Sequence, residues 1–262
     1  MTKHKNHYKA TPIKLIVEIL TLSPKNFMKV ILRNNITGIP DEEIISRLCY
    51  GSSLVRWGDG ETALARGKFI WFQRQDPNLG LKLKEILRQE NPNLQVCIPI
   101  KVINSSSFSY IGKRRYNFWK EFSSRVFFAR YLNRNNKNFG DSGIWYRNSG
   151  MLFEILSKIV NNRNVLLIGS EERIADHMRE IGFSTSFLKV PDRDAYDEYP
   201  RILNEVQEWT RALLHGAKGI VISVAGPVGK VLALELASEQ QVLDIGHGIL
   251  LNLDGEFKIV KY

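Results

Sequence analysis

Two acidic residues, Asp59 and Glu61, lie one residue apart directly after the predicted strand Ser53–Trp57. In an extended or tightly turned segment, side chains at positions i and i+2 share one face, so both carboxylates can point at one spot. The flanking Gly58 and Gly60 let the backbone adopt unusual dihedral angles and approach a ligand closely. Paired carboxylates suit Mg²⁺ or Mn²⁺, and such an ion suits a diphosphate. An ordinary acidic, glycine-rich turn is the alternative interpretation of these residues.

Short apolar runs alternate with helical patterns along most of the chain, and this alternation positions the acidic segment. It predicts an α/β fold, Rossmann-like, with a mainly parallel sheet that is flanked by helices. The predicted strands are Ser53–Trp57, Leu94–Ile98, Val165–Ile168, Ser184–Val190, Gly219–Val224 and Gln241–Ile245. No repeat or low-complexity linker interrupts the pattern. We therefore predict a basic helical segment over residues 1–35 and one α/β domain over residues 36–262.

Ligands of open parallel sheets bind at the carboxyl ends of the strands, so the loops at those ends are the candidate site. Pro227 opens a predicted helix whose free N–H groups can meet a phosphate, although a tight strand-to-helix turn explains the same residues. The loop is not a Walker A motif, because Val224 and Val231 occupy two of its required positions. The turn at Gly169 lacks the glycine pattern of a dinucleotide-binding loop, which disfavours an NAD site.

His247 is the best functional candidate among five histidines, because it follows a strand end close to Asp244. It could contact a phosphate or accept a proton. A hydrogen-bonded structural histidine is the alternative. No combination of Ser, His and Asp, or of Cys and His, can be assembled into a nucleophilic site from this sequence.

The net charge of +10 is concentrated in two segments. Residues 1–33 carry seven Lys or Arg against one acid, a charge of +6, and residues 113–137 carry eight against one, a charge of +7. Both segments fit an anionic partner, such as nucleic acid, lipid headgroups or a phosphorylated substrate, and both also fit a solvated helix face. Cys49 and Cys97 lie in apolar stretches, which predicts buried free thiols in a reducing compartment.

No apolar run is long enough to span a bilayer, and residues 13–22 do not continue into a signal-peptide cleavage site. We therefore expect a cytoplasmic protein, with peripheral contact to the inner face of an anionic membrane through residues 1–33 as one option. Packing of that segment on the body or on a partner subunit is another option, and a homo-oligomer stays open.

Four segments in this order resemble the GT-D-fold glycosyltransferases, a bacterial family. They are Arg56-Trp-Gly-Asp-Gly-Glu61, Val190-Pro-Asp-Arg-Asp-Ala-Tyr196, Ala225-Gly-Pro-Val-Gly-Lys-Val-Leu232 and Asp244-Ile-Gly-His247. The resemblance covers about residues 40–250. The chain departs from the family pattern at Asp194, where an Asn is expected, and after His247, where members carry an acid and aromatics.

The resemblance implies a metal-dependent transfer of a hexose from a nucleotide diphosphate sugar, usually a UDP-sugar, in bacterial surface-glycan assembly. Asp59 and Glu61 match the family's D-x-E motif, which implies that they bind Mn²⁺ or Mg²⁺ and the diphosphate. Asp59, Glu61 and His247 are the predicted catalytic residues. The residues predicted to bind the nucleotide sugar are Arg56, Gly58, Gly60, Gly169, Ser170, Asp194, Gly226, Pro227 and Asp244.

The acceptor is expected to be a glycan, a glycoprotein or a lipid-linked sugar. Glu61, Asp194 and His247 are the candidates for a general base that deprotonates its hydroxyl. Two alternative functions stay open at this stage. One is a nucleic-acid-binding module that uses residues 113–137, and the other is a metal-dependent nucleotide phosphohydrolase in which water replaces the acceptor.

Overall fold

The computed structural model describes residues 12–31, 36–105, 115–133, 138–148, 151–213, 219–246, 249–251 and 257–259. Seven strands form one sheet in the order β3-β2-β1-β7-β6-β4-β5, and all six neighbouring pairs are parallel. The strands are β1 (Ser53–Arg56), β2 (Leu94–Ile98), β3 (Gly140–Asp141), β4 (Val165–Gly169), β5 (Thr185–Lys189), β6 (Ile220–Ser223) and β7 (Val242–Asp244). The predicted α/β fold with a parallel sheet is confirmed.

Helices cover both faces of this sheet, which explains why its central strands are continuous apolar runs. Along β1, Leu54 packs into one core layer and Val55 into the other, as the two-residue period of a strand requires. The layer around Val55 includes α4 (Asp59–Ala65), α5 (Pro77–Ile86), α6 (Ile100–Asn104), α7 (Arg115–Tyr131), α11 (Tyr199–Ala212) and α12 (Pro227–Leu236). The layer around Leu54 includes α3 (Asp41–Cys49), α8 (Ile144–Arg147), α9 (Leu152–Val160) and α10 (Arg173–Glu180).

The chain leaves β4 and β6 toward opposite faces of the sheet. After β4 it enters α10 on one face, and after β6 it enters α12 on the other. Because β4 and β6 are neighbours, the two connections diverge at their carboxyl ends and leave a crevice there. The fold thus contains a topological switch point between these strands.

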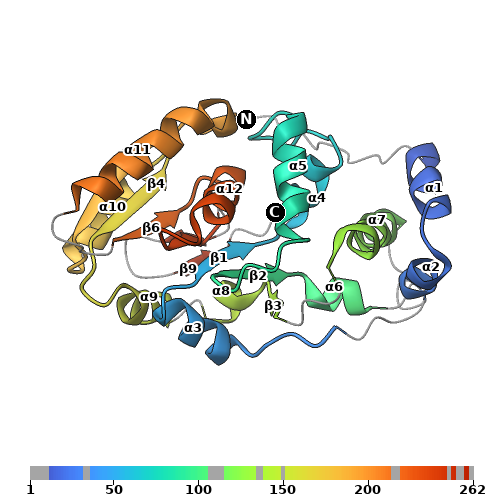
Figure 1. Ribbon diagram of the computed structural model, residues 1–262, viewed down its shortest axis with the longest axis horizontal. Helices are drawn as coiled ribbons and strands as arrows, with labels where there is room; N and C mark the ends of the chain where they lie inside the picture. Colours follow the sequence, from blue (N-terminus) through green and yellow to red (C-terminus); the bar gives the residue numbers. More distant parts are fainter. Residues whose placement is uncertain are drawn as a thin grey trace.

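The helices α1 (Pro12–Leu20) and α2 (Pro24–Ile31) lie beside α7 at one end of the structure, and α10 and α11 lie at the other end (Figure 1). Leu15 and Val30 pack against Val126 of α7. Glu18 forms an ion pair with Arg66, which follows α4. The helical part of the prediction for this segment therefore holds over residues 12–31, and one face of it packs on the body.

The smaller elements were not predicted from the sequence. The segment that begins at Asp59 is a helix, α4, and the 3-10 helix η3 (Ala195–Glu198) follows β5. An antiparallel pair, β8 (Ile249–Leu251) and β9 (Phe257–Ile259), follows the sheet along the chain. Cys97 is buried as predicted, but Cys49 is exposed because it ends α3 at the rim of the fold. In the part of the chain that is described, no helix combines the length and apolarity needed to cross a membrane.

We predict that Leu83→Ala lowers the free energy of unfolding by about 2 to 5 kcal/mol, because Leu83 is fully buried between α5 and the sheet. Leu81 on the same helix is 62% exposed, so Leu81→Ala should change it by less than about 0.5 kcal/mol. Urea unfolding of the two variants measures both values. Equal losses would contradict the packing of α5.

Candidate active site

The loops predicted to converge do lie at one edge of the sheet. All seven strands are parallel, so the segments that follow β1, β4, β5, β6 and β7 meet at the same carboxyl edge. That edge holds Arg56, Gly169, Asp194, Gly226 and Asp244. His247 lies outside the described residues, so its predicted role stays a prediction.

The acidic motif begins a helix, and this corrects its predicted geometry. Gly58 is the N-cap of α4, and its N–H donates to Glu61 Oε2 at 2.7 Å, so the glutamate caps its own helix. Each helical residue turns by about 100°, so positions i and i+2 point to nearly opposite sides. Asp59 is exposed and Glu61 is only 7% exposed. The expectation that both carboxylates share one face was wrong, because acids favour a helix N-terminus over an extended turn here.

A buried ion group of three residues lies behind the motif. The Nζ of Lys230, on α12, is 3.1 Å from Glu61 Oε1 and 2.9 Å from Asp244 Oδ2. The side chains of Lys230 and Asp244 are 3% and 0% exposed. Nζ also donates to the carbonyl of Gly226 at 3.3 Å, and the N–H of Arg56 donates to Asp244 Oδ2 at 3.1 Å. This group therefore ties the ends of β1, β6 and β7 together.

Burial and charge pairing act in opposite directions on Glu61 and Lys230. Burial by itself would raise the pKa of Glu61, but the ammonium of Lys230 and the backbone N–H groups of Glu61 and Gly58 together outweigh it and leave that pKa below its ordinary value. Burial by itself would lower the pKa of Lys230, but Asp244 and Glu61 outweigh it and leave that pKa above its ordinary value. Glu61 and Lys230 are thus both charged at neutral pH, and the same ammonium also contacts Asp244.

Lys230 was not among the predicted site residues, although a signal for it exists. It is a single cation inside the otherwise uncharged run Val228–Leu234, and a buried charge of that kind needs an anionic partner. The preceding Gly229 allows the close approach, because a Cβ there would lie 2.2 Å from Ser223 Oγ. The position of Lys230 one turn into α12 brings its charge under the Gly226–Pro227 loop.

Arg56 ends β1 at the same edge, and its guanidinium packs against Gly246 and Tyr146. A Cβ on Gly246, whose φ is +72°, would lie 2.0 Å from a terminal nitrogen of Arg56, so only glycine leaves room for the guanidinium. The guanidinium also stacks over the ring of Tyr146, 5.2 Å from its centroid. Arg56 Nε is buried and has no hydrogen-bond partner among the described residues.

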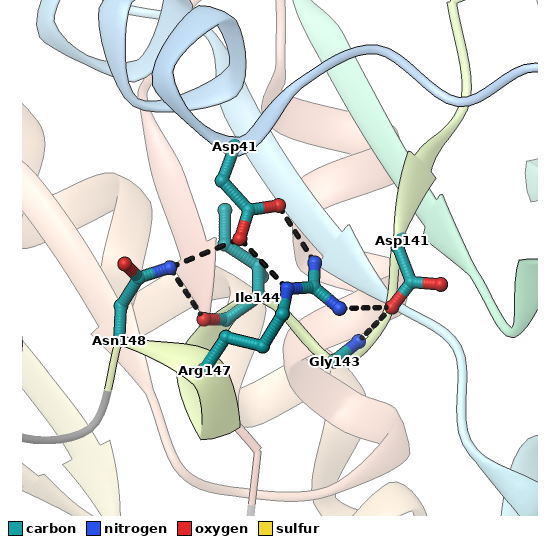
Figure 2. A network of polar contacts seen from close by, with 6 residues as sticks. All are labelled: Asp41, Asp141, Gly143, Ile144, Arg147 and Asn148. Carbon is teal, nitrogen blue, oxygen red and sulfur yellow. Dashed lines mark hydrogen bonds and ion pairs between the residues drawn. The ribbon is translucent and has the colours of Figure 1, made fainter.

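Ion pairs and hydrogen bonds in the helix layer around Leu54 position Tyr146. Figure 2 shows the neighbouring Arg147 held between Asp41 at the start of α3 and Asp141 at the end of β3. Its Nε and one terminal nitrogen donate to the two oxygens of Asp41 at 2.9 and 2.6 Å. Asn148 also donates to Asp41, at 3.1 Å. This bidentate geometry fixes the short helix α8 and hence the tyrosine that contacts Arg56.

A small pocket opens at the switch point between β4 and β6. Two predicted residues, Ser170 and Pro227, line it together with the loop after β5. Its lining is Phe72, Gln73, Ser170, Val190, Pro191, Asp192, Ala195, Val224, Ala225 and Pro227. Gly226 has a φ of +59°, and a Cβ there would lie 2.8 Å from the ring of Phe72. The pocket therefore combines a helix N-terminus, a hydroxyl and an aromatic wall.

Asp194 lies beside this pocket but faces another loop. Its φ of +55° is left-handed, which Asp tolerates better than most residues. Its Oδ1 accepts from the N–H of Arg74 at 2.5 Å, and its own N–H donates to the carbonyl of Phe72 at 2.9 Å. The structure therefore gives Asp194 a positioning contact with residues 72–74.

A second cavity, of about 460 Å³, lies at the amino edge of the sheet. Its wall includes Phe153, Arg163 and Phe183, and none of the predicted site residues lines it. In open parallel sheets the ligand binds at the carboxyl ends, so the switch-point pocket is the better candidate despite its smaller volume.

The metal prediction stays a prediction, and the carboxylates near α4 show which residue is placed to hold an ion. No group of three or more His, Cys, Asp or Glu within the described ranges is placed to hold an ion by itself. Both oxygens of Glu61 are engaged, one by Lys230 and the other by the N–H of Gly58. Asp59 is exposed at the carboxyl edge, and an ion bound to a diphosphate needs only one or two protein carboxylates.

A parallel sheet with a small pocket at its switch point defines an open α/β protein, and comparison with known proteins specifies the family. The family profile described as glycosyltransferase GT-D fold matches residues 54–251. The chain belongs to this family, and the resemblance inferred from the four motifs is confirmed.

Two curated relatives from streptococci match as well. A probable glycosyl transferase Gly from Streptococcus gordonii is 27% identical over 83% of this chain and 32% of its own length. The glycosyltransferase GlyD from Streptococcus pneumoniae is 25% identical over 99% of this chain and 31% of its own length. The chain thus spans about a third of the length of these relatives.

Solved structures share the fold. A structure described as a new glycosyltransferase (DUF1792) from Streptococcus sanguinis has a TM-score of 0.63 at 23% identity, covering 81% of this chain and 82% of that one. A second, described as a highly conserved domain with a distinct glycosyltransferase fold, has a TM-score of 0.62 at 21% identity, covering 89% and 82%. At these identities the likeness shows the fold alone.

We predict that Lys230→Met lowers the free energy of unfolding by about 3 to 5 kcal/mol at pH 7, because it leaves two buried carboxylates without their cation. Without that cation the effect of burial raises the pKa of Glu61, so acidification to pH 5 should protonate Glu61 and recover part of the loss. Urea unfolding at both pH values measures this.

Lys158→Met is the matched control, because Lys158 pairs with Glu154 on an exposed helix surface. Its cost should stay below about 1 kcal/mol at either pH. A loss in Lys230→Met that grows on acidification would contradict the shared-charge geometry.

Proposed function

We propose that the protein transfers a hexose from a nucleotide diphosphate sugar to an acceptor hydroxyl. The observation that carries this proposal is the switch-point pocket beside the buried Lys230 group, in a chain that belongs to the GT-D glycosyltransferase family. A UDP-sugar is the proposed donor, and bacterial surface-glycan assembly is the proposed context.

The diphosphate is the part of the donor that the carboxyl edge suits best. The first turn of α12 carries free N–H groups and the positive end of the helix dipole at Pro227, which lines the pocket. Lys230 lies one turn below, where Glu61 and Asp244 neutralise its charge, so its part is to hold the first turn of α12 in position. The hydroxyl of Ser170 and the guanidinium of Arg56 supply further donors at the same edge.

The reaction forms a bond between the acceptor oxygen and the anomeric carbon and breaks the bond from that carbon to the diphosphate. Negative charge develops on the departing diphosphate, and fixed positive groups lower the barrier because they are already oriented toward it. Arg56 and the N-terminus of α12 are the proposed positive groups, whereas Lys230 is neutralised by its two carboxylate partners and keeps them in place.

A bound Mn²⁺ or Mg²⁺ would supply Lewis-acid stabilisation of the same charge. In our proposal Asp59 is the carboxylate that holds it, with the diphosphate oxygens completing its shell. Glu61 keeps Lys230 and the start of α4 in place. A direct metal bond from Glu61 would require it to give up Lys230 or Gly58.

The acceptor proposal stays with a glycan, a glycoprotein or a lipid-linked sugar. Asp194 and His247 remain the proposed proton acceptors, because Glu61 would have to release Lys230 to serve as one. The nucleic-acid alternative loses support, since Arg125 of the basic segment 113–137 is buried and donates to the carbonyl of Lys29. A phosphohydrolase would use the same edge, and turnover of donor without acceptor would distinguish it.

Peripheral binding to the inner face of an anionic membrane is part of this proposal. Among the described residues, α1 and α2 expose a group of large apolar side chains, which we call the outer face: Ile16, Val17, Leu20, Phe27 and Met28. Lys25 is exposed beside them, and residues 1–33 carry a net charge of +6. Apolar and basic side chains together fit an anionic lipid surface.

We predict that UDP with Mn²⁺ raises the melting temperature of the protein, since a ligand at 100 times its dissociation constant adds about 2.7 kcal/mol of stability. Asp59→Asn should abolish the metal-dependent part of the shift and should leave the unliganded melting temperature within a few degrees. Thermal-shift scans with UDP, GDP, CMP and ADP, each with and without Mn²⁺, measure this. A metal-dependent shift in Asp59→Asn equal to that of the wild type would contradict the assignment of Asp59 as a metal ligand.

We predict that the protein sediments with vesicles of phosphatidylcholine plus phosphatidylglycerol but not with phosphatidylcholine alone, and that salt weakens the binding. The double variant Ile16→Ser, Leu20→Ser should lose most of it, because Leu20 is 77% exposed on the outer face. Leu81→Ser is the control for general loss of surface apolarity. Unchanged sedimentation of the double variant would contradict the membrane contact.

A further inference from the structure

A short hairpin projects at the rim of the switch-point pocket. Ile70 and Gln73 exchange backbone hydrogen bonds at 2.9 and 3.2 Å, so Trp71 and Phe72 form its two-residue tip. Phe72 and Gln73 line the pocket itself. The tip therefore lies directly beside the proposed position of the donor.

The side chains of the hairpin alternate between the body and the solvent. Ile70 is 5% exposed and Phe72 packs on Gly226, whereas Phe69 and Trp71 are 62% and 52% exposed. Neither Phe69 nor Trp71 belongs to a described core cluster, so the core does not account for them. We call Phe69 and Trp71 the aromatic platform. Exposed aromatics grouped at the rim of a pocket mark a binding surface.

The hairpin is held rigidly, which a binding platform requires. The carbonyl of Phe72 accepts from Asp194 N, and the N–H of Arg74 donates to Asp194 Oδ1. Gln73 is 1% exposed, and its side chain accepts from the N–H of Tyr196 at 3.2 Å. Arg74 also pairs with Asp197 at 2.5 Å. These contacts fix the tip before any ligand binds, which lowers the entropy cost of binding.

We propose that the aromatic platform binds the acceptor by stacking against a pyranose ring. This inference rests on the proposed glycosyl transfer. A pyranose presents an apolar face of C–H groups, and an aromatic ring with its negative face is the matching surface. Phe72 forms the wall of the donor pocket, and the Trp71 ring packs edge-on against it with the ring centroids 5.0 Å apart. Trp71 is still 52% exposed, so its outer surface is open to the second substrate. The acceptor hydroxyl would then reach the anomeric carbon across the rim.

The test uses the full chain, with UDP and Mg²⁺ present and cellobiose as the probe sugar. Saturation-transfer NMR gives the cellobiose dissociation constant, and thermal shift gives UDP binding. Trp71→Ala should weaken cellobiose binding by about three- to tenfold, as loss of one aromatic stacking contact implies. Trp71→Phe should restore most of it. Tyr50→Ala is the control, because Tyr50 is 89% exposed before β1 at the amino edge.

The outcomes separate this inference from the proposed function. UDP stabilisation that is equal in the wild type and in Trp71→Ala, with weaker cellobiose binding only in the latter, supports the platform. Equal cellobiose binding in both proteins, or no saturable binding by the wild type, overturns it. Weaker UDP binding in Trp71→Ala would assign the tryptophan to the nucleobase and also overturn it. Failure of UDP to stabilise any of these proteins would count against the donor site.

Discussion

The carboxyl edge of the sheet depends on one buried ammonium. Lys230 joins Glu61 from α4 to Asp244 from β7, and all three are nearly inaccessible to water. A buried charge pair contributes little net stability compared with apolar packing, but removing one partner is costly. The ion group therefore fixes how α4, α12 and β7 are placed relative to one another, because both carboxylates must reach the same nitrogen.

The surrounding contacts extend this arrangement outward in two directions. On one side, Asp244 accepts from the backbone of Arg56, whose guanidinium rests on Gly246 and stacks on Tyr146. On the other side, Gly226 contacts the ring of Phe72, which belongs to the hairpin that Asp194 holds by hydrogen bonds. Charge, helix ends and aromatic surface are thus assembled around one pocket by elements that are remote in sequence.

Much of the fold could be predicted because its signals are local. The strand Leu94–Ile98 was predicted at its observed bounds, β4 within one residue, and α12 from its first residue, Pro227, since apolar runs and helix-opening residues mark them. The small elements could not be predicted so well. The helix α4 begins inside a motif that also suits a turn, and only packing of Glu61 on Lys230 distinguishes the two.

The sequence by itself determined the fold class, the family motifs and the loops that carry polar residues, because periodicity and short motifs are properties of neighbouring residues. Only the tertiary structure decided that Asp59 faces solvent while Glu61 faces Lys230, since a helix separates side chains that a strand would align. It also decided that Asp194 holds the hairpin of Phe72, a contact across more than a hundred residues. Such long-range pairings depend on the strand order, which local patterns do not encode.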